Sequence, residues 1–216
     1  MKMLAVLALL PGLLLATEFS EPYGVLDTAA VGVIQPFVPK HMQVIALAKG
    51  ELNADGKDDY AVVVQATQPD LGKANPRRLL TVLSDADAEG GLRVTNQYWH
   101  FIPSPDAADA ADPLSYIGIH DGLLEVKFVP AGAGRSHLTY TFKREGKRFV
   151  LDVFNQYKVN PNTGMFNETQ VDVGKGTRLT TAGSMSSPRH RKSEDSFMPD
   201  RIWTPCFIRD PLHFEL

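Results

Sequence analysis

From about residue 42 onward, apolar side chains recur along the chain at every second position. This alternation is typical of strands with one buried and one exposed face. It is clearest at Leu138, Tyr140 and Phe142, which alternate with polar neighbours. Further strand candidates, several of them apolar on both faces and each bounded by turn residues, lie at 43–48, 60–65, 78–83, 92–99, 166–173 and 178–181. Residues 60–65, which are apolar on both faces, predict a central strand that is buried on both sides.

Two hairpins are predicted by their turn residues. Asp121-Gly122 and Glu145-Gly146 each separate a pair of alternating segments. An Asp-Gly pair suits the tight turn between antiparallel strands. Residues 24–38 show weak helical spacing limited by Gly32 and Pro36, which predicts a short N-terminal helix. The fold class is therefore mainly β, with a β-rich α+β fold as the alternative: an antiparallel sheet of about nine strands with one short helix.

The two ends of the chain differ from this central region. Residues 1–16 combine Lys2, an apolar run and the small residue Ala16, the layout of a secretory signal peptide. The β-rich domain is expected over 17–182. Residues 183–216 form a C-terminal extension that we expect to be partly disordered, because 183–200 are rich in Ser, Pro, Arg and Lys. Within that stretch, the basic run 189–192 is interpreted as a solvated linker.

The charge and the cysteine content of the chain exclude several classes of protein. The chain has 216 residues, a formal net charge of −3 and a single cysteine. This balance gives no electrostatic basis for nucleic-acid binding. Cys206 alone excludes an internal disulfide or a cysteine zinc cluster, and we expect an inert, buried thiol. With the signal peptide, these features predict a periplasmic or secreted protein with no transmembrane segment after cleavage.

One loop has the spacing of a calcium site. Oxygen-bearing residues recur in the stretch ELNADGKDD, with a glycine at its sixth position, and calcium prefers such oxygen-rich, tightly turned loops. The candidate ligands are Glu51, Asn53, Asp55, the backbone carbonyl of Lys57, and Asp59. A structural calcium ion is thus one hypothesis. The alternative is a turn closed by hydrogen bonds alone, for which Asn, Asp and Gly are equally suited.

The same loop carries a family resemblance. The stretch KGELNADGKDDYAVVV is similar to the loop of FG-GAP-like repeats, which place D-x-[DN]-x-D-G-x-x-D beside a β-strand. More broadly, residues 36–182 resemble a family of exported bacterial proteins of poorly defined function. The resemblance is carried by RRLLTVLSDADAEGGLRV, YIGIHDGLLEV, LTYTFKREGKRFVLDVFNQY and NPNTGMFNETQVDVGKGTRL. It implies one β-rich periplasmic or secreted domain and no established catalysis.

Three functions follow as hypotheses. The first is a non-catalytic domain that binds a protein or a cell-envelope component. The second is a periplasmic immunity protein that neutralises an antibacterial toxin, with the acidic loop 103–113 in a basic cleft. The third is an envelope hydrolase using His100 or His120. The sequence shows no nucleophile or histidine-pair motif, which favours the non-catalytic hypotheses.

Overall fold

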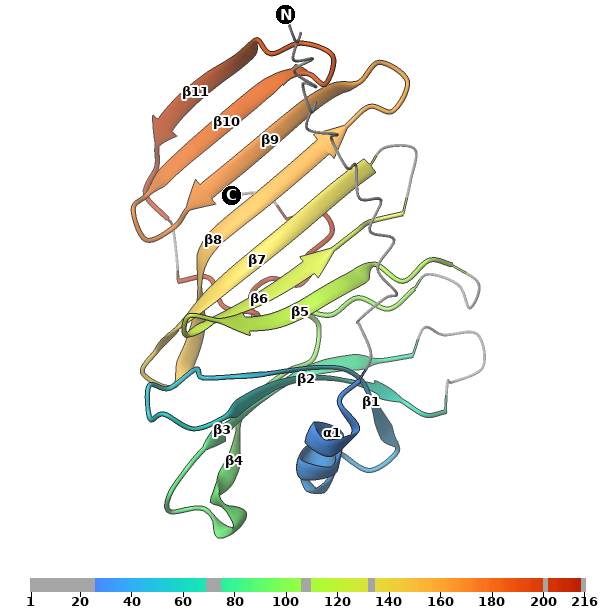
Figure 1. The fold of residues 1–216 in the computed structure, drawn as a ribbon, viewed down its shortest axis with the longest axis vertical. Coiled ribbons are helices and arrows are strands. Elements are labelled where there is room, and N and C mark those ends of the chain that lie inside the picture. The colour runs from blue at the N-terminus through green and yellow to red at the C-terminus, as the bar shows by residue number, and fades with distance from the viewer. Residues whose placement is uncertain (1–25, 69–74, 106–109, 132–134, 200–201, 215–216) are drawn as a thin grey trace, which may run out of the picture.

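The fold consists of two antiparallel sheets, as the computed structural model in Figure 1 shows. The structure describes residues 26–68, 75–105, 110–131, 135–199 and 202–214. The prediction of a mainly β fold with a short N-terminal helix is confirmed. The predicted signal peptide, 1–16, lies outside the described residues. Among those that are described, no helix is long and apolar enough to cross a membrane.

The first sheet has four strands in chain order and the second has seven. Helix α1 (Thr28–Ile34) continues into the 3-10 turn η1 (Gln35–Phe37), and a second such turn, η2 (Glu89–Gly91), precedes β4. The small sheet comprises β1 (Met42–Gly50), β2 (Asp59–Ala66), β3 (Arg77–Ser84) and β4 (Leu92–Tyr98). The large sheet comprises β5 (Leu114–His120), β6 (Leu123–Phe128), β7 (Arg135–Glu145), β8 (Arg148–Val159), β9 (Met165–Asp172), β10 (Thr177–Ser184) and β11 (His190–Ser196).

Helix α1 covers one face of the small sheet. The Asp27 carboxylate accepts hydrogen bonds from the N–H groups of Ala29 and Ala30, at 2.9 and 3.3 Å, and so caps the first turn. The helix buries Ala30 and Ile34 against apolar side chains of β2 and β3. These are Tyr60, Val62, Val64, Leu80 and Val82. Since the opposite face of β2 is also buried, the prediction of a central strand at 60–65 is confirmed.

The other face of the small sheet packs on β5 of the large sheet. Strand β1 turns three small residues toward this junction, namely Ala46, Ala48 and Gly50. A Cβ atom added to Gly50 would lie 2.7 Å from Cγ2 of Ile119, closer than side chains can pack. The two backbones therefore approach each other here only because the side chains of β1 are small.

An aromatic cluster fills the space between the sheets. Phe101, in the segment that leads from β4 to β5, is fully buried. Its ring makes edge-on contacts with Phe128, Tyr140 and Phe142 at centroid distances of 5.3 to 5.6 Å. Such geometry stabilises aromatic pairs beyond the area that they bury. Phe101 belongs to the one core cluster that contains buried residues of both sheets.

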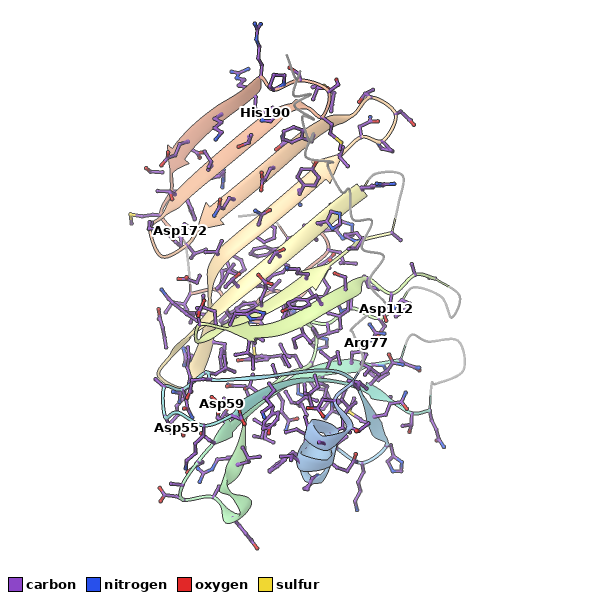
Figure 2. All side chains as sticks on the ribbon, viewed as in Figure 1. Asp55, Asp59, Arg77, Asp112, Asp172 and His190 are labelled. Carbon is purple, nitrogen blue, oxygen red and sulfur yellow. The ribbon has the colours of Figure 1, made fainter. Side chains whose placement is uncertain are left out.

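The same connecting segment is held by an ion pair. Arg77 at the start of β3 is 4% exposed and forms a two-pronged pair with Asp112. Arg77 also donates to the carbonyl of Pro103, at 3.0 Å, and to Gln65, at 2.8 Å. One guanidinium group therefore ties both ends of the acidic loop 103–113 to the small sheet. Figure 2 shows Arg77 and Asp112 together beside the junction of the two sheets.

The C-terminal region is more ordered than the sequence predicts. Residues 190–196 form β11, paired with β10 along its whole length, where we expected disorder. The segment 202–214 packs on the large sheet. Leu151 N–H donates to the Trp203 carbonyl at 2.7 Å, and the Tyr140 hydroxyl donates to the Pro211 carbonyl at 2.6 Å. Cys206 in this segment is exposed, so the expectation of a buried thiol is wrong.

Truncating the ring of Phe101 tests how much it contributes to the stability of the shared core. Phe101→Ala should lower the free energy of unfolding by about 3 to 5 kcal/mol, because a large buried cavity forms. Phe207→Ala, at a phenylalanine that is 57% exposed, should change it by less than about 0.5 kcal/mol. Urea unfolding followed by circular dichroism measures both, and equal effects of the two substitutions would contradict this role.

Candidate functional site

The predicted calcium loop connects β1 and β2 at one end of the small sheet. Its first residue, Glu51, folds its carboxylate back over the turn. Oε1 accepts from the N–H groups of Asn53, at 2.8 Å, and Ala54, at 2.7 Å, and Oε2 accepts from Gly56 N–H at 2.5 Å. Partial desolvation opposes ionisation, but these three donors outweigh it and lower the pKa of Glu51. The glutamate therefore closes the loop on itself.

The next two predicted ligands bind to the end of β3. Asn53 donates from Nδ2 to both the carbonyl and the hydroxyl of Ser84, each at 3.1 Å. Asp55 accepts a hydrogen bond from the Ser84 hydroxyl, which is the first cause of its lowered pKa, and it also accepts from Lys57 N–H at 2.9 Å. Asn53 Oδ1 in turn accepts from Asp55 N–H at 3.0 Å. Ser84 is thus the anchor of the loop, although its sequence position gave no sign of that role.

The fourth side chain, Asp59, is fully buried. Its Oδ2 accepts from Leu52 N–H and its Oδ1 from Ser84 N–H, both at 2.7 Å. Burial raises the pKa of Asp59, against these two hydrogen bonds and with help from the nearby carboxylates of Glu51 and Asp55. Asp59 therefore joins the base of the loop to the neighbouring strand β3. Figure 2 shows it close to Asp55 at this end of the sheet.

The five predicted residues lie in the loop and at the start of β2, but the side-chain oxygens of Glu51, Asn53, Asp55 and Asp59 accept hydrogen bonds. The carboxylates of Glu51, Asp55 and Asp59 accept from N–H and O–H groups of the loop and of Ser84. Among the residues that the structure describes, no three or more His, Cys, Asp or Glu side chains are grouped to hold a metal ion. The loop is closed by its own hydrogen bonds, and calcium binding stays a prediction.

The histidines considered for hydrolysis lie in unremarkable settings. His120 is exposed, stacks on Tyr116 and shares a hydrogen bond with its hydroxyl. His100 is also exposed. Within the described ranges, no serine or cysteine side chain forms a hydrogen bond with a histidine ring. This arrangement lends the hydrolase hypothesis no support.

A second candidate site lies on the large sheet. Leu138, Tyr140 and Phe142 of β7 point into the core, so the alternating residue His137 points to the opposite face. Tyr157 of β8 lies directly opposite His137, with ring centroids 6.3 Å apart. We call this opposite face of β7 to β11 the outer face.

The rings continue across the outer face into the next strands. Phe166 of β9 stacks on Tyr157 at 5.8 Å, and His190 of β11 meets Phe166 edge-on at 5.0 Å. Phe166 and His190 are separated by a whole strand, β10, which contributes Gly183 between them. A Cβ atom on Gly183 would lie 2.6 Å from Cδ2 of His190, so only glycine lets the two rings meet. His137, Tyr157, Phe166 and His190 form what we call the aromatic row.

The aromatic row borders a shallow hollow of about 340 Å³. His137, Tyr157 and Met185 line it, together with Arg135 and the turn at Asn160-Pro161. Met185 is 68% exposed. Aromatic, methionine and arginine side chains are the types enriched in the buried centres of protein interfaces. The outer face therefore has the composition of a binding surface.

Comparison of the chain with protein families, with curated proteins and with solved structures returns no match. The resemblance to exported bacterial proteins therefore stays a prediction.

The calcium hypothesis is tested by thermal unfolding in calcium and in chelator. Binding to the folded state alone, at a tenfold excess over Kd, would add about 1.4 kcal/mol and raise Tm by about 3 to 5 °C. Asp55→Asn should abolish this rise. Asp58→Asn, which changes the neighbouring carboxylate outside the ligand set, should keep it. Equal midpoints of the unchanged protein in millimolar calcium and in chelator would contradict the hypothesis.

The closure of the loop by Glu51 predicts a pH dependence. Because the pKa of Glu51 is lower in the folded protein than the unfolded value of about 4.3, its ionised form stabilises the fold above that pH. This contribution is lost as pH falls through the folded pKa. The stability difference between the protein and Glu51→Gln should therefore be largest near neutral pH and shrink toward about pH 3. Urea unfolding at a series of pH values measures it; Glu89→Gln, at an exposed turn, should show no such trend.

Proposed function

We propose that this protein is a non-catalytic binding domain whose partner is a protein or a cell-envelope component, and that it acts in the periplasm or outside the cell. The observation that carries the proposal is the outer face of the large sheet. The aromatic row and the adjacent hollow lie on strands that extend well beyond the small sheet (Figure 1). His137 and His190 are exposed, and Tyr157 and Phe166 are partly exposed.

The chemistry of the outer face supports binding rather than catalysis. Tyr157 and Phe166 offer rigid apolar rings that lose little conformational entropy when a partner covers them. Glu168 and Asn155, which are hydrogen bonded to each other at 3.1 Å, lie beside the rings on the same face and supply polar contacts. A rigid apolar centre with polar neighbours is the usual anatomy of a protein interface.

The immunity-protein hypothesis rests on the acidic loop 103–113, and the structure engages part of that loop within the chain. Asp112 pairs with the buried Arg77 and also accepts from Leu114 N–H at 3.0 Å. This carboxylate is therefore committed to the fold rather than to a basic cleft of a toxin. Residues 106–109 of the loop lie outside the described residues. No further observation favours this hypothesis over general partner binding.

Affinity capture tests the binding role. The tagged protein and the variant Tyr157→Ala/Phe166→Ala are incubated with cell-envelope extract, and retained components are quantified by mass spectrometry. Specific partners should be reduced by at least about tenfold with the variant, as expected when hot-spot rings are removed. Trp99→Ala, which removes another ring that is 53% exposed, serves as the control and should retain them.

Circular dichroism of all three proteins checks that they are folded. The proposal is contradicted if the double variant captures the same components, in the same amounts, as the unchanged protein. It is equally contradicted if the folded, unchanged protein retains no component above a tag-only control.

A further inference from the structure

The large sheet ends in an edge strand whose outer side is unpaired within the described residues. Strand β11 pairs with β10 on one side, and it is last in the strand order of its sheet. All seven of its residues are exposed. Figure 1 shows β11 at the end of the molecule farthest from the small sheet. Unpaired edges of this kind are templates for another strand.

The hydrogen bonding to β10 determines which backbone N–H and C=O groups of β11 point away from β10. Phe197 N–H donates to the Gly176 carbonyl at 2.9 Å, in the same register as the pair Thr177 and Ser196. In an antiparallel pair, hydrogen-bonded positions recur at every second residue. The odd-numbered residues of β11 therefore bond to β10. The even-numbered residues direct their N–H and C=O groups to the open edge.

The charges of β11 are arranged symmetrically about Ser193 with the sign reversed, a pattern that we call a charge palindrome. Its central residues are Arg191, Lys192, Ser193, Glu194 and Asp195, two cations followed by a serine and two anions. Suppose that a second copy of the strand runs antiparallel with Ser193 opposite Ser193. Lys192 then lies opposite Glu194 of the other copy, and Arg191 opposite Asp195. All four charged residues of each copy face the opposite charge.

The backbone also permits this register. It pairs even-numbered with even-numbered residues, whose N–H and C=O groups point to the open edge. Shifting the register to the next permitted alignment in one direction places Lys192 opposite Lys192. Shifting it in the other direction places Glu194 opposite Glu194. Like charges directly opposite each other destabilise a strand pair, so the palindrome selects a single alignment.

We propose that β11 is a homodimerisation edge, on which two copies of this chain pair antiparallel about Ser193 to join their large sheets into one continuous sheet. The two-fold axis at Ser193 is perpendicular to the sheet, so both outer faces lie on the same side. The dimer would thereby place two aromatic rows on one surface. Charged residues on an edge can instead serve to keep other strands away, in which case the protein stays monomeric.

Analytical ultracentrifugation of the purified protein distinguishes these outcomes. We expect a monomer–dimer equilibrium over a concentration range that reaches about 1 mM, because one strand pair buries less area than a typical stable interface. Association should weaken as salt is raised, since the ion pairs are exposed. Lys192→Glu, which places Glu opposite Glu194 twice in each dimer, should weaken dimerisation by at least about tenfold.

Charge exchange supplies the decisive control. The double variant Lys192→Glu/Glu194→Lys restores opposite charges across the edge and should return the dissociation constant to within about threefold of its original value. Lys147→Glu, the same charge change at an exposed turn, should leave it unaltered. The proposal is overturned by a monomer throughout the concentration range, by a dimer that tolerates Lys192→Glu, or by a double variant that fails to dimerise. Because no extract is used, these outcomes are independent of the binding role proposed above.

Discussion

The close contact between the two sheets is the constraint on which the rest of this structure depends. Strand β1 presents Ala46, Ala48 and Gly50 to the junction, and β5 packs against it so closely that a methyl group at Gly50 would collide with Ile119. In the same core cluster, the Phe101 ring packs edge-on against Phe128 and Phe142 of the large sheet. Small residues on one part and a large ring on the other let two twisted sheets share a single core. The helix and the C-terminal segment then cover surfaces that this arrangement leaves apolar.

Hydrogen bonds and an ion pair fix the two ends of the small sheet. At one end, the loop between β1 and β2 is closed by Glu51 and anchored to β3 through Ser84. At the other, Arg77 holds Asp112 and the carbonyl of Pro103. In both cases a buried or half-buried charge is matched by several hydrogen bonds, which offset the cost of its desolvation. The acidic residues that stand out in the sequence therefore serve, in large part, to position backbone.

The large sheet is used differently along its width. Strands β5 to β8 bury one face in the shared core, and β9 adds Val171 to it, whereas β10 and β11 contain no buried residue. A sheet that extends beyond its own core has little to gain in stability from its last strands. The aromatic row crosses from β7 to β11 on the face that points away from this core, and the charge palindrome lies on its last strand. Both proposals therefore use surfaces of the large sheet that do not face its core.

The sequence alone determined the local elements. Period-two alternation and the turns at Asp121-Gly122 and Glu145-Gly146 were sufficient for most strands, because these signals act between neighbouring residues. Strand β11 was missed since its residues are polar on both faces and carry no such period. The 51–59 loop was found from its spacing, but its anchor Ser84 lies 25 residues beyond Asp59 and bonds to it only in the folded chain. The aromatic row, the Phe101 contacts and the free edge of β11 were decided by strand register and sheet packing, because those bring together residues whose separation along the chain holds no local signal.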